Sequence, residues 1–150
     1  MKVYKATLID LEHVSQLFDL YRVFYKQSSN IGAAKEFIRE RMEKEDSVIF
    51  IAVENGSYLG FTQLYPSFSS VSMKRLWILN DLYVTREARN KGVAKKLLDA
   101  AKQLAIDTQA KGLNLQTALD NLAAQSLYEA DGWVKDEAFY SYELILSQIN

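Results

Sequence analysis

Cysteine is absent from the 150-residue chain, and His13 is its only histidine. The absence of cysteine excludes disulfides, thiolate metal ligands and a cysteine nucleophile, and one histidine cannot build a histidine metal site alone. One proline and six glycines leave no stretch typical of an interdomain linker. We therefore expect a single domain over residues 1–150, with no metal.

A surplus of charge of one sign is also missing. The 18 Lys and Arg residues nearly balance the 19 Asp and Glu residues, which gives a net charge of −1. Nucleic-acid-binding proteins usually carry a basic surplus, so we expect no nucleic-acid partner. No apolar run approaches the roughly 20 residues of a membrane-spanning helix, and the first residues lack a signal-peptide core. These absences predict a soluble, cytoplasmic protein with no membrane partner.

Hydrophobic periodicity divides the chain into strands and helices. It predicts an edge strand within 1–8, helices at 10–27 and 31–45, strands near 48–53, 58–65 and 75–84, a helix from 93, a strand at 113–118, a helix at 120–130 and a last strand at 139–146. Asn55-Gly56 predicts a tight hairpin turn, so the three middle strands should form an antiparallel meander. The strand–helix–strand unit that follows should be parallel and right-handed. The predicted fold class is α/β (an α+β mixed sheet) with helices on both faces.

The most informative stretch is Arg89-Asn90-Lys91-Gly92-Val93-Ala94, between a predicted strand and a predicted helix. Four basic residues crowd this helix start: Arg89, Lys91, Lys95 and Lys96. The helix macrodipole already places about half a positive charge there, so the arrangement repels itself unless an anion neutralises it. Free backbone N–H groups beside a glycine can cradle a phosphate. The alternative is a solvated basic turn that caps a core helix, but the position of Gly92 at the junction favours an anion site.

The pattern around Gly92 narrows the kind of phosphate ligand. A nucleotide P-loop has a Lys-Ser/Thr pair after its last glycine, whereas Val93-Ala94 follows here. A dinucleotide fingerprint needs three glycines, of which only one is present. The stretch resembles instead the pyrophosphate loop of the GNAT superfamily of N-acetyltransferases, whose pattern is Arg/Gln-x-x-Gly-x-Gly/Ala. Arg89, Gly92 and Ala94 match this pattern.

A second motif resembles the other CoA-binding segment of the same superfamily. It reads Asn121-x-x-Ala124-x-x-Leu127-Tyr128-x-x-x-Gly132-Trp133. Ala124, Leu127 and Tyr128 should share one helix face. Taken alone, the segment also fits a helix cap at Asn121 followed by core residues. Both motifs occur in the superfamily's order and spacing, so the chain resembles a GNAT acetyltransferase, which implies a GNAT-like sheet of about six to seven strands.

The resemblance implies acetyl-CoA as the cosubstrate and gives each motif residue a role. The backbone of Leu82, Tyr83 and Val84 would bind the pantetheine arm and the thioester carbonyl. The pyrophosphate would lie on the loop and helix start: Arg89, Asn90, Lys91, Gly92, Val93, Ala94 and Lys95. Asn121 would meet the pantetheine or pyrophosphate arm, and Tyr128 would act in catalysis near the sulfur. Because the reference pKa of tyrosine, about 10, exceeds that of a thiol, about 8.5, we expect Tyr128 to hydrogen-bond the developing thiolate.

Several residues are candidates for accepting the proton of the amine. Asp81 borders the strand residues expected to bind the thioester and is the first candidate for this catalytic role. The alternative is that Asp81 satisfies backbone groups or positions a helix. The other candidates are Glu143, Tyr25 and Tyr65. The Leu79-to-Val84 segment resembles the polyamine-acetylating branch, which has Glu-Asp where this chain has Asn80-Asp81. The departure removes the expected base of that branch and puts polyamine specificity in doubt.

The predicted function is acetyl transfer to the primary amine of a small molecule. With no cysteine and no obvious Ser/His pair, direct attack in a ternary complex is simpler than a covalent acetyl-enzyme. A protein lysine or N-terminal acetyltransferase and a catalytically weak acyl-CoA sensor remain alternatives. The last predicted strand has one largely apolar face: Tyr140, Tyr142, Leu144 and Leu146. That face predicts a homodimer, whereas burial under the first two helices would give a monomer.

Overall fold

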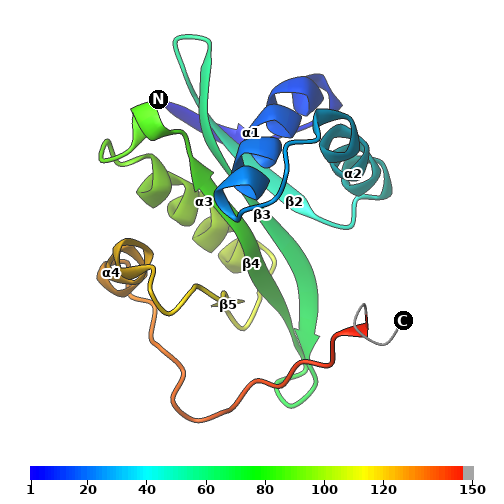
Figure 1. The fold of residues 1–150 in the computed structure, drawn as a ribbon. Helices are drawn as coiled ribbons and strands as arrows, with labels where there is room; N and C mark the ends of the chain where they lie inside the picture. The colour runs from blue at the N-terminus through cyan, green and yellow to red at the C-terminus, as the bar shows by residue number, and fades with distance from the viewer. Residues whose placement is uncertain (147–150) are drawn as a thin grey trace. The chain divides into compact units, whose positions relative to one another are not determined.

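The computed structural model describes residues 1–146 of the chain. The chain forms two compact units, one from Met1 to Gln116 and one that begins at Thr117. The first unit contains the sheet and three α-helices, and the second contains one α-helix (Figure 1). None of the helices in residues 1–146 is long and apolar enough to cross a membrane.

The first unit is built on an antiparallel meander. Its strands and α-helices are β1 (Lys2–Lys5), α1 (Leu11–Phe24), α2 (Ile31–Lys44), β2 (Val48–Glu54), β3 (Ser57–Ser69), β4 (Lys74–Val84), α3 (Val93–Asp107) and β5 (Leu113–Asn114). The strand order is β1-β2-β3-β4-β5. Neighbouring strands are antiparallel except for β4 and β5, which are parallel. The predicted edge strand, the meander and the parallel return after α3 are therefore confirmed.

Local sequence signals explain several boundaries in this unit. The side-chain oxygen of Asn30 accepts a hydrogen bond from the N–H of Ala33 at 3.0 Å, which caps the start of α2. Asn55 and Gly56 have φ values of 50° and 79°, as a tight hairpin turn requires. The buried carboxylate of Asp10 accepts from the N–H of Thr7 at 3.0 Å and the hydroxyl of Tyr4 at 2.9 Å. Asp10 therefore anchors the entry to α1.

Helices cover both faces of the sheet, as the sequence predicts. On one face, buried residues of α1 and α2 pack against β2 and β3: Val14, Leu17, Phe18, Ile38, Ile51 and Phe61. On the other face, Val93 and Leu97 of α3 pack with Ala52 of β2, and Leu82 and Val84 of β4 join them. Figure 1 shows α1 and α2 together on one side of this sheet and α3 on the other.

The predicted strand count is wrong for the single chain. The described residues form five strands rather than six to seven. The strand expected at 113–118 is limited to Leu113–Asn114, and the strand expected at 139–146 is absent. A strand exists only where a neighbour supplies the ladder hydrogen bonds, and no strand in residues 1–146 pairs with 139–146. An alternating pattern alone does not provide that neighbour.

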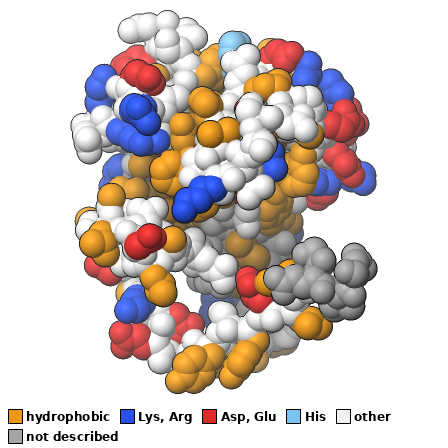
Figure 2. Space-filling model, viewed as in Figure 1, with side chains coloured by type: hydrophobic (Ala, Val, Ile, Leu, Met, Phe, Trp, Pro, Cys, Tyr) orange, Lys and Arg blue, Asp and Glu red, His pale blue; other side chains and the backbone are white. Residues whose placement is uncertain are grey.

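The second unit contains α4 (Leu122–Ala130) and an exposed segment that follows it. The helix confirms the prediction at 120–130. Large apolar side chains remain exposed along the segment, and Figure 2 shows hydrophobic side chains on the surface. Tyr140 and Tyr142 are each 91% exposed. Phe139 and Leu144 are both 82% exposed. This surface is unusual for a folded chain, because contiguous apolar patches generally mark an interface.

Candidate functional site

The junction between β4 and α3 has the backbone geometry of an anion site. Gly92 stands immediately before α3 with φ 80° and ψ 11°, a left-handed conformation that favours glycine. A Cβ at Gly92 would meet no atom within 4 Å, so conformation rather than crowding selects glycine. The first turn of α3 contains no acidic residue. Among residues 1–146, no backbone carbonyl accepts the N–H of Val93 or Ala94, so both are orphan donors of the first helical turn.

The basic residues at this junction differ in their contacts. Lys95 pairs with Asp99 one turn along α3. Lys91 and Lys96 make no ion pair within residues 1–146. The Nε of Arg89 donates to the Val84 carbonyl at 3.1 Å, and its guanidinium carbon lies 5.8 and 5.7 Å from the ring centres of Phe24 and Tyr83. Arg89 therefore ties the loop to the end of β4.

Strand β4 contains a bulge that the sequence did not predict. Gln63 of β3 lies opposite Asp81 and Leu64 lies opposite Leu79, so Asn80 is an extra residue on β4. Beyond the bulge, β4 continues to pair with β3. β5 pairs with β4 only at Trp77 and Ile78. The side of β4 that faces away from β3 therefore has no strand partner after the bulge in this unit.

Ladder alternation determines which backbone groups line this open edge. The N–H of Thr85 donates to the Leu59 carbonyl at 2.9 Å, so Thr85 and Tyr83 turn their backbone groups toward β3. Leu82 and Val84 consequently turn theirs toward the open edge. The contact from Arg89 to the Val84 carbonyl agrees with this direction. Leu82, Tyr83 and Val84 of β4 are predicted to bind the cosubstrate. Leu82 and Val84 present backbone groups at the open edge, whereas Tyr83 presents its side chain to α1.

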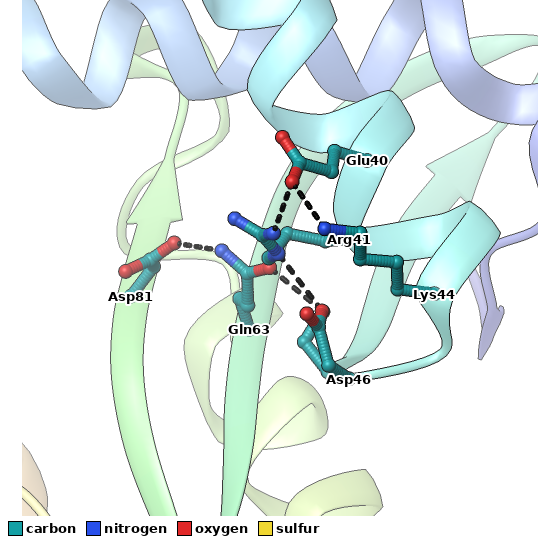
Figure 3. A network of polar contacts seen from close by, with 7 residues as sticks. Glu40, Arg41, Lys44, Asp46, Gln63 and Asp81 are labelled. Carbon is teal, nitrogen blue, oxygen red and sulfur yellow. Dashed lines mark hydrogen bonds and ion pairs between the residues drawn. The ribbon is translucent and has the colours of Figure 1, made fainter.

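Asp81 is buried at the bulge with both carboxylate oxygens engaged. Gln63 Nε2 donates to Asp81 Oδ2 at 2.6 Å (Figure 3). Asn80 Nδ2 donates to Oδ1 at 2.7 Å. Burial raises the pKa of Asp81, whereas hydrogen bonds from Asn80 and Gln63 lower it. Burial and the nearby Asp81 charge raise the pKa of Tyr65 to about 12, so that phenol stays protonated at neutral pH.

The same region contains residues that sequence reasoning missed. The Tyr21 hydroxyl donates to the Asn80 carbonyl at 3.2 Å, and the Ser47 hydroxyl donates to Gln63 Oε1 at 2.9 Å. Burial is the largest cause that raises the pKa of Tyr21, followed by the Asp81 charge. The one feature of the sequence that could have identified Gln63 is its polar amide within residues 61–64, a run that is buried in the structure. Of the other predicted bases, Tyr25 is exposed just after α1 with its ring centre 5.0 Å from that of Tyr21, and Glu143 is exposed in the second unit.

The second predicted motif forms its own local structure in the second unit. The side-chain oxygen of Asn121 accepts from the N–H of Ala124 at 3.2 Å and caps α4. The ring centres of Tyr128 and Trp133 are 5.9 Å apart, and the backbone N–H of Trp133 donates to the Tyr128 carbonyl at 3.0 Å. Ala124, Leu127 and Tyr128 are all half-buried, as a shared helix face predicts. The Asn121 oxygen therefore serves the helix cap, as the alternative interpretation of this segment predicts.

Comparisons with known proteins agree with the motifs. The pattern of the Acetyltransferase (GNAT) family matches residues 14–133. The "Uncharacterized N-acetyltransferase YhfO" of Bacillus subtilis is 49% identical over 142 residues, which cover 95% of each chain. A "Probable acetyltransferase" of Haemophilus influenzae is 32% identical over 148 residues, which cover 98% of this chain and 99% of the relative.

A solved structure supports the same assignment. The crystal structure of a probable acetyltransferase has a TM-score of 0.93 and 43% sequence identity, and the match covers 97% of this chain and 98% of that one. The chain belongs to the GNAT family of acetyltransferases. Members of this family use acetyl-CoA as the acetyl donor.

Proposed function

We propose that this acetyltransferase transfers the acetyl group of acetyl-CoA to the primary amine of a small molecule, by direct attack in a ternary complex. One observation carries the proposal. The first unit places an N-terminal helix turn with unpaired N–H donors directly after a strand whose far edge is open beyond its bulge. A phosphate-bearing arm that ends in a thioester is a ligand that matches both features.

The residues of the first unit fit the cosubstrate. The N–H groups of Val93 and Ala94, with Lys91 beside them, would hold the pyrophosphate, together with Arg89, Asn90, Gly92 and Lys95 of the same stretch. The outward backbone groups of Leu82 and Val84 would bind the pantetheine arm. When bound, acetyl-CoA supplies the thioester that the amine attacks. A main-chain N–H at the open edge would stabilise the oxyanion that forms on the thioester carbonyl.

In the second unit we assign Asn121 to the cosubstrate arm and Tyr128 to the leaving sulfur. Complete proton transfer from a phenol with a pKa of about 10 to a thiolate whose acid has a pKa of about 8.5 is uphill by about 2 kcal/mol. The Tyr128 hydroxyl would therefore hydrogen-bond the developing thiolate. The final proton on the sulfur would come from the ammonium product.

An aromatic surface in the first unit supports a small amine as the acceptor. Phe24 and Tyr25 are 53% and 48% exposed at the end of α1. Phe24 lies 6.4 Å from Tyr83 of β4, measured between ring centres. Aromatic faces attract alkylammonium groups and pack against apolar bodies. The Arg89 guanidinium over Phe24 and Tyr83 adds positive charge here, which favours a monoamine over a polyamine.

A protein N-terminus is the second candidate acceptor. N-alpha-acetyltransferase 30 of Schizosaccharomyces pombe is 30% identical to this chain over 139 residues. On the side of small molecules, D-amino-acid N-acetyltransferase HPA3 of Saccharomyces cerevisiae is 31% identical over 87 residues. The two names point to different acceptors, and the aromatic surface leads us to favour the small amine.

A panel of acceptors, each assayed separately, tests the acceptor class. Monoamines, diamines and short peptides with free N-termini or lysines are each supplied with acetyl-CoA, and release of the CoA thiol is measured. We expect kcat/KM for the best monoamine to exceed that for any peptide at least tenfold. A peptide that outperforms every small amine would replace the proposal with the second candidate. Release of no thiol with any acceptor would indicate an acyl-CoA sensor.

We also propose a homodimer formed through the exposed C-terminal segment. Phe139, Tyr140 and Tyr142 are each at least 82% exposed. At 150–250 Å² per aromatic side chain, these three residues alone expose about 500 Å² per chain. Covering this area on two copies would bury about 1,000 Å², which reaches the size of a specific interface. A two-fold pairing uses the same segment on both chains.

A further inference from the structure

The bulge of β4 is fixed by side chains from several elements. The Tyr21 hydroxyl of α1 donates to the Asn80 carbonyl at 3.2 Å, and the Thr62 hydroxyl of β3 donates to the Asp81 carbonyl at 2.7 Å. Gln63 and Asn80 donate to the two carboxylate oxygens of Asp81 at 2.6 and 2.7 Å. Both backbone carbonyls of the bulge and its carboxylate thus each receive a side-chain hydrogen bond.

The hydrogen bonds from Thr62 and Gln63 to Asp81 lie in the interior, the bond from Asn80 is partly buried, and the bond from Tyr21 to the Asn80 carbonyl is exposed. Thr62 and Gln63 are 0% exposed and Asp81 is 2% exposed. Every buried side-chain nitrogen or oxygen within residues 1–146 has a partner. Gln63 is held at both ends, because its Oε1 accepts from Ser47 while its Nε2 donates to Asp81. A flipped amide would face the carboxylate with an oxygen, so the network permits one orientation.

The network reaches α2 through neighbouring residues. Ser47 follows Asp46, whose carboxylate pairs with Arg41 at 2.8 Å (Figure 3). Arg41 also pairs with Glu40 at 3.4 Å, and Glu40 pairs with Lys44 at 2.7 Å. The segment that precedes β2 is therefore anchored to α2. The Gln63 amide separates Asp81 from these ionisable groups, and an amide does not readily relay a proton.

The bulge decides which backbone groups of β4 face the open edge. Ladder directions alternate along a strand, so one extra residue reverses the direction of every residue beyond it. If Asn80 paired regularly with β3 and did not stand as an extra residue, the backbone groups of Tyr83 would face the open edge in place of those of Leu82 and Val84. A bulge that shifted or relaxed would move the donors that we assign to the cosubstrate, and small misplacements of reacting groups slow reactions strongly.

We propose that Tyr21, Thr62, Gln63 and Asp81 form a clamp that holds the β4 bulge, and that Asp81 serves the reaction as a positioning residue. The amine therefore loses its proton to another acceptor, such as water. The clamp rests on the proposed function only in assigning the open edge to the thioester. Its structural part concerns the first unit alone.

The test compares Tyr21→Phe and Asp81→Asn with a matched control, Tyr4→Phe. Tyr4→Phe likewise removes a tyrosine hydroxyl that donates a hydrogen bond, here to the buried Asp10 and not to the bulge, so it lies outside the clamp. We expect Tyr21→Phe to lower kcat about tenfold and to shift the backbone amide NMR signals of residues 80–84. We expect Tyr4→Phe to leave the kcat and these signals near wild type. Asp81→Asn should lower kcat while the acidic limb of the pH–kcat/KM profile stays in place.

Two results would overturn the clamp. The first is loss of the acidic limb in Asp81→Asn, which would identify Asp81 as the base. The second is Tyr21→Phe with wild-type kcat and unshifted signals at residues 80–84. If Asp81→Asn does not fold, Tyr21→Phe decides the question alone. The NMR readout also separates the two proposals, because a wild type that releases no CoA thiol refutes the function while the amide shifts still test the clamp.

Discussion

At the scale of single residues, the structure distinguishes the backbone conformation that selects a residue type from the contacts that a side chain makes. Gly92 is needed for its left-handed backbone, since a Cβ there would meet no atom within 4 Å. Asn121 caps α4 through its side-chain oxygen. The cosubstrate contact that we propose for Asn121 would therefore involve its amide nitrogen. The position of Asp81 beside Leu82 predicts a catalytic role, but the sequence does not show that hydrogen bonds engage both of its carboxylate oxygens.

Gly92 gives a test of the anion site. Saturating acetyl-CoA at about 100 times its Kd should add about 2.7 kcal/mol to the free energy of unfolding and raise Tm by several degrees. Gly92→Asp should abolish this shift, because it adds negative charge where the pyrophosphate binds. Gly92→Asn is the matched control: asparagine tolerates the left-handed conformation and is neutral. Equal shifts in both variants, measured by differential scanning fluorimetry, would contradict the assignment.

Tyr128 gives a test of the leaving-group contact. Tyr128→Phe keeps the ring beside Trp133 and removes only the hydroxyl. We expect kcat to fall about 10- to 1,000-fold while the affinity for acetyl-CoA stays near wild type, in line with the contribution of a general acid. Steady-state kinetics and calorimetry measure the two quantities. An unchanged kcat would make Tyr128 a packing residue.

At the scale of elements, local patterns predicted the helices and the meander, and long-range pairing supplied the rest. Apolar periodicity located α1, α2, α3 and α4, and Asn55-Gly56 located the β2–β3 turn. The bulge at Asn80 was not predictable, because it depends on the register between β3 and β4. The strand expected at 139–146 is absent since alternation gives a preference for extended chain and does not supply a neighbouring strand.

The close approach of β3 to β4 gives a prediction for Gly60. A Cβ there would lie 2.6 Å from the Tyr83 carbonyl oxygen and 3.2 Å from the Val84 Cα, both of them backbone atoms. Gly60→Ala should therefore displace the end of β4, lower the free energy of unfolding by about 1–3 kcal/mol and weaken acetyl-CoA binding. Gly112→Ala is the control, since a Cβ there meets nothing within 4 Å. Denaturant unfolding and calorimetry would show both effects, and wild-type values for Gly60→Ala would refute them.

At the scale of the whole molecule, the exposed segment after α4 predicts self-association. Light scattering at micromolar concentration should give about twice the chain mass of 17.2 kDa. Tyr142→Asp should return the protein to a monomer, because it places a charge in the proposed interface. Ser126→Asp, at an exposed position of the same unit outside the segment, adds the same single negative charge and serves as the control. A wild-type mass equal to one chain would refute the dimer.

Direct acetyl transfer in a ternary complex is tested by measuring the balance of products for the purified wild-type protein. Acetyl-CoA and the best monoamine from the acceptor panel are incubated with it, and free CoA and acetylated amine are both quantified over time. We expect equal molar amounts of the two products, formation of both only when acetyl-CoA and amine are present together, and no acetyl group left on the protein. An acetylated protein that forms from acetyl-CoA alone and then transfers its acetyl group to the amine would contradict direct attack in a ternary complex.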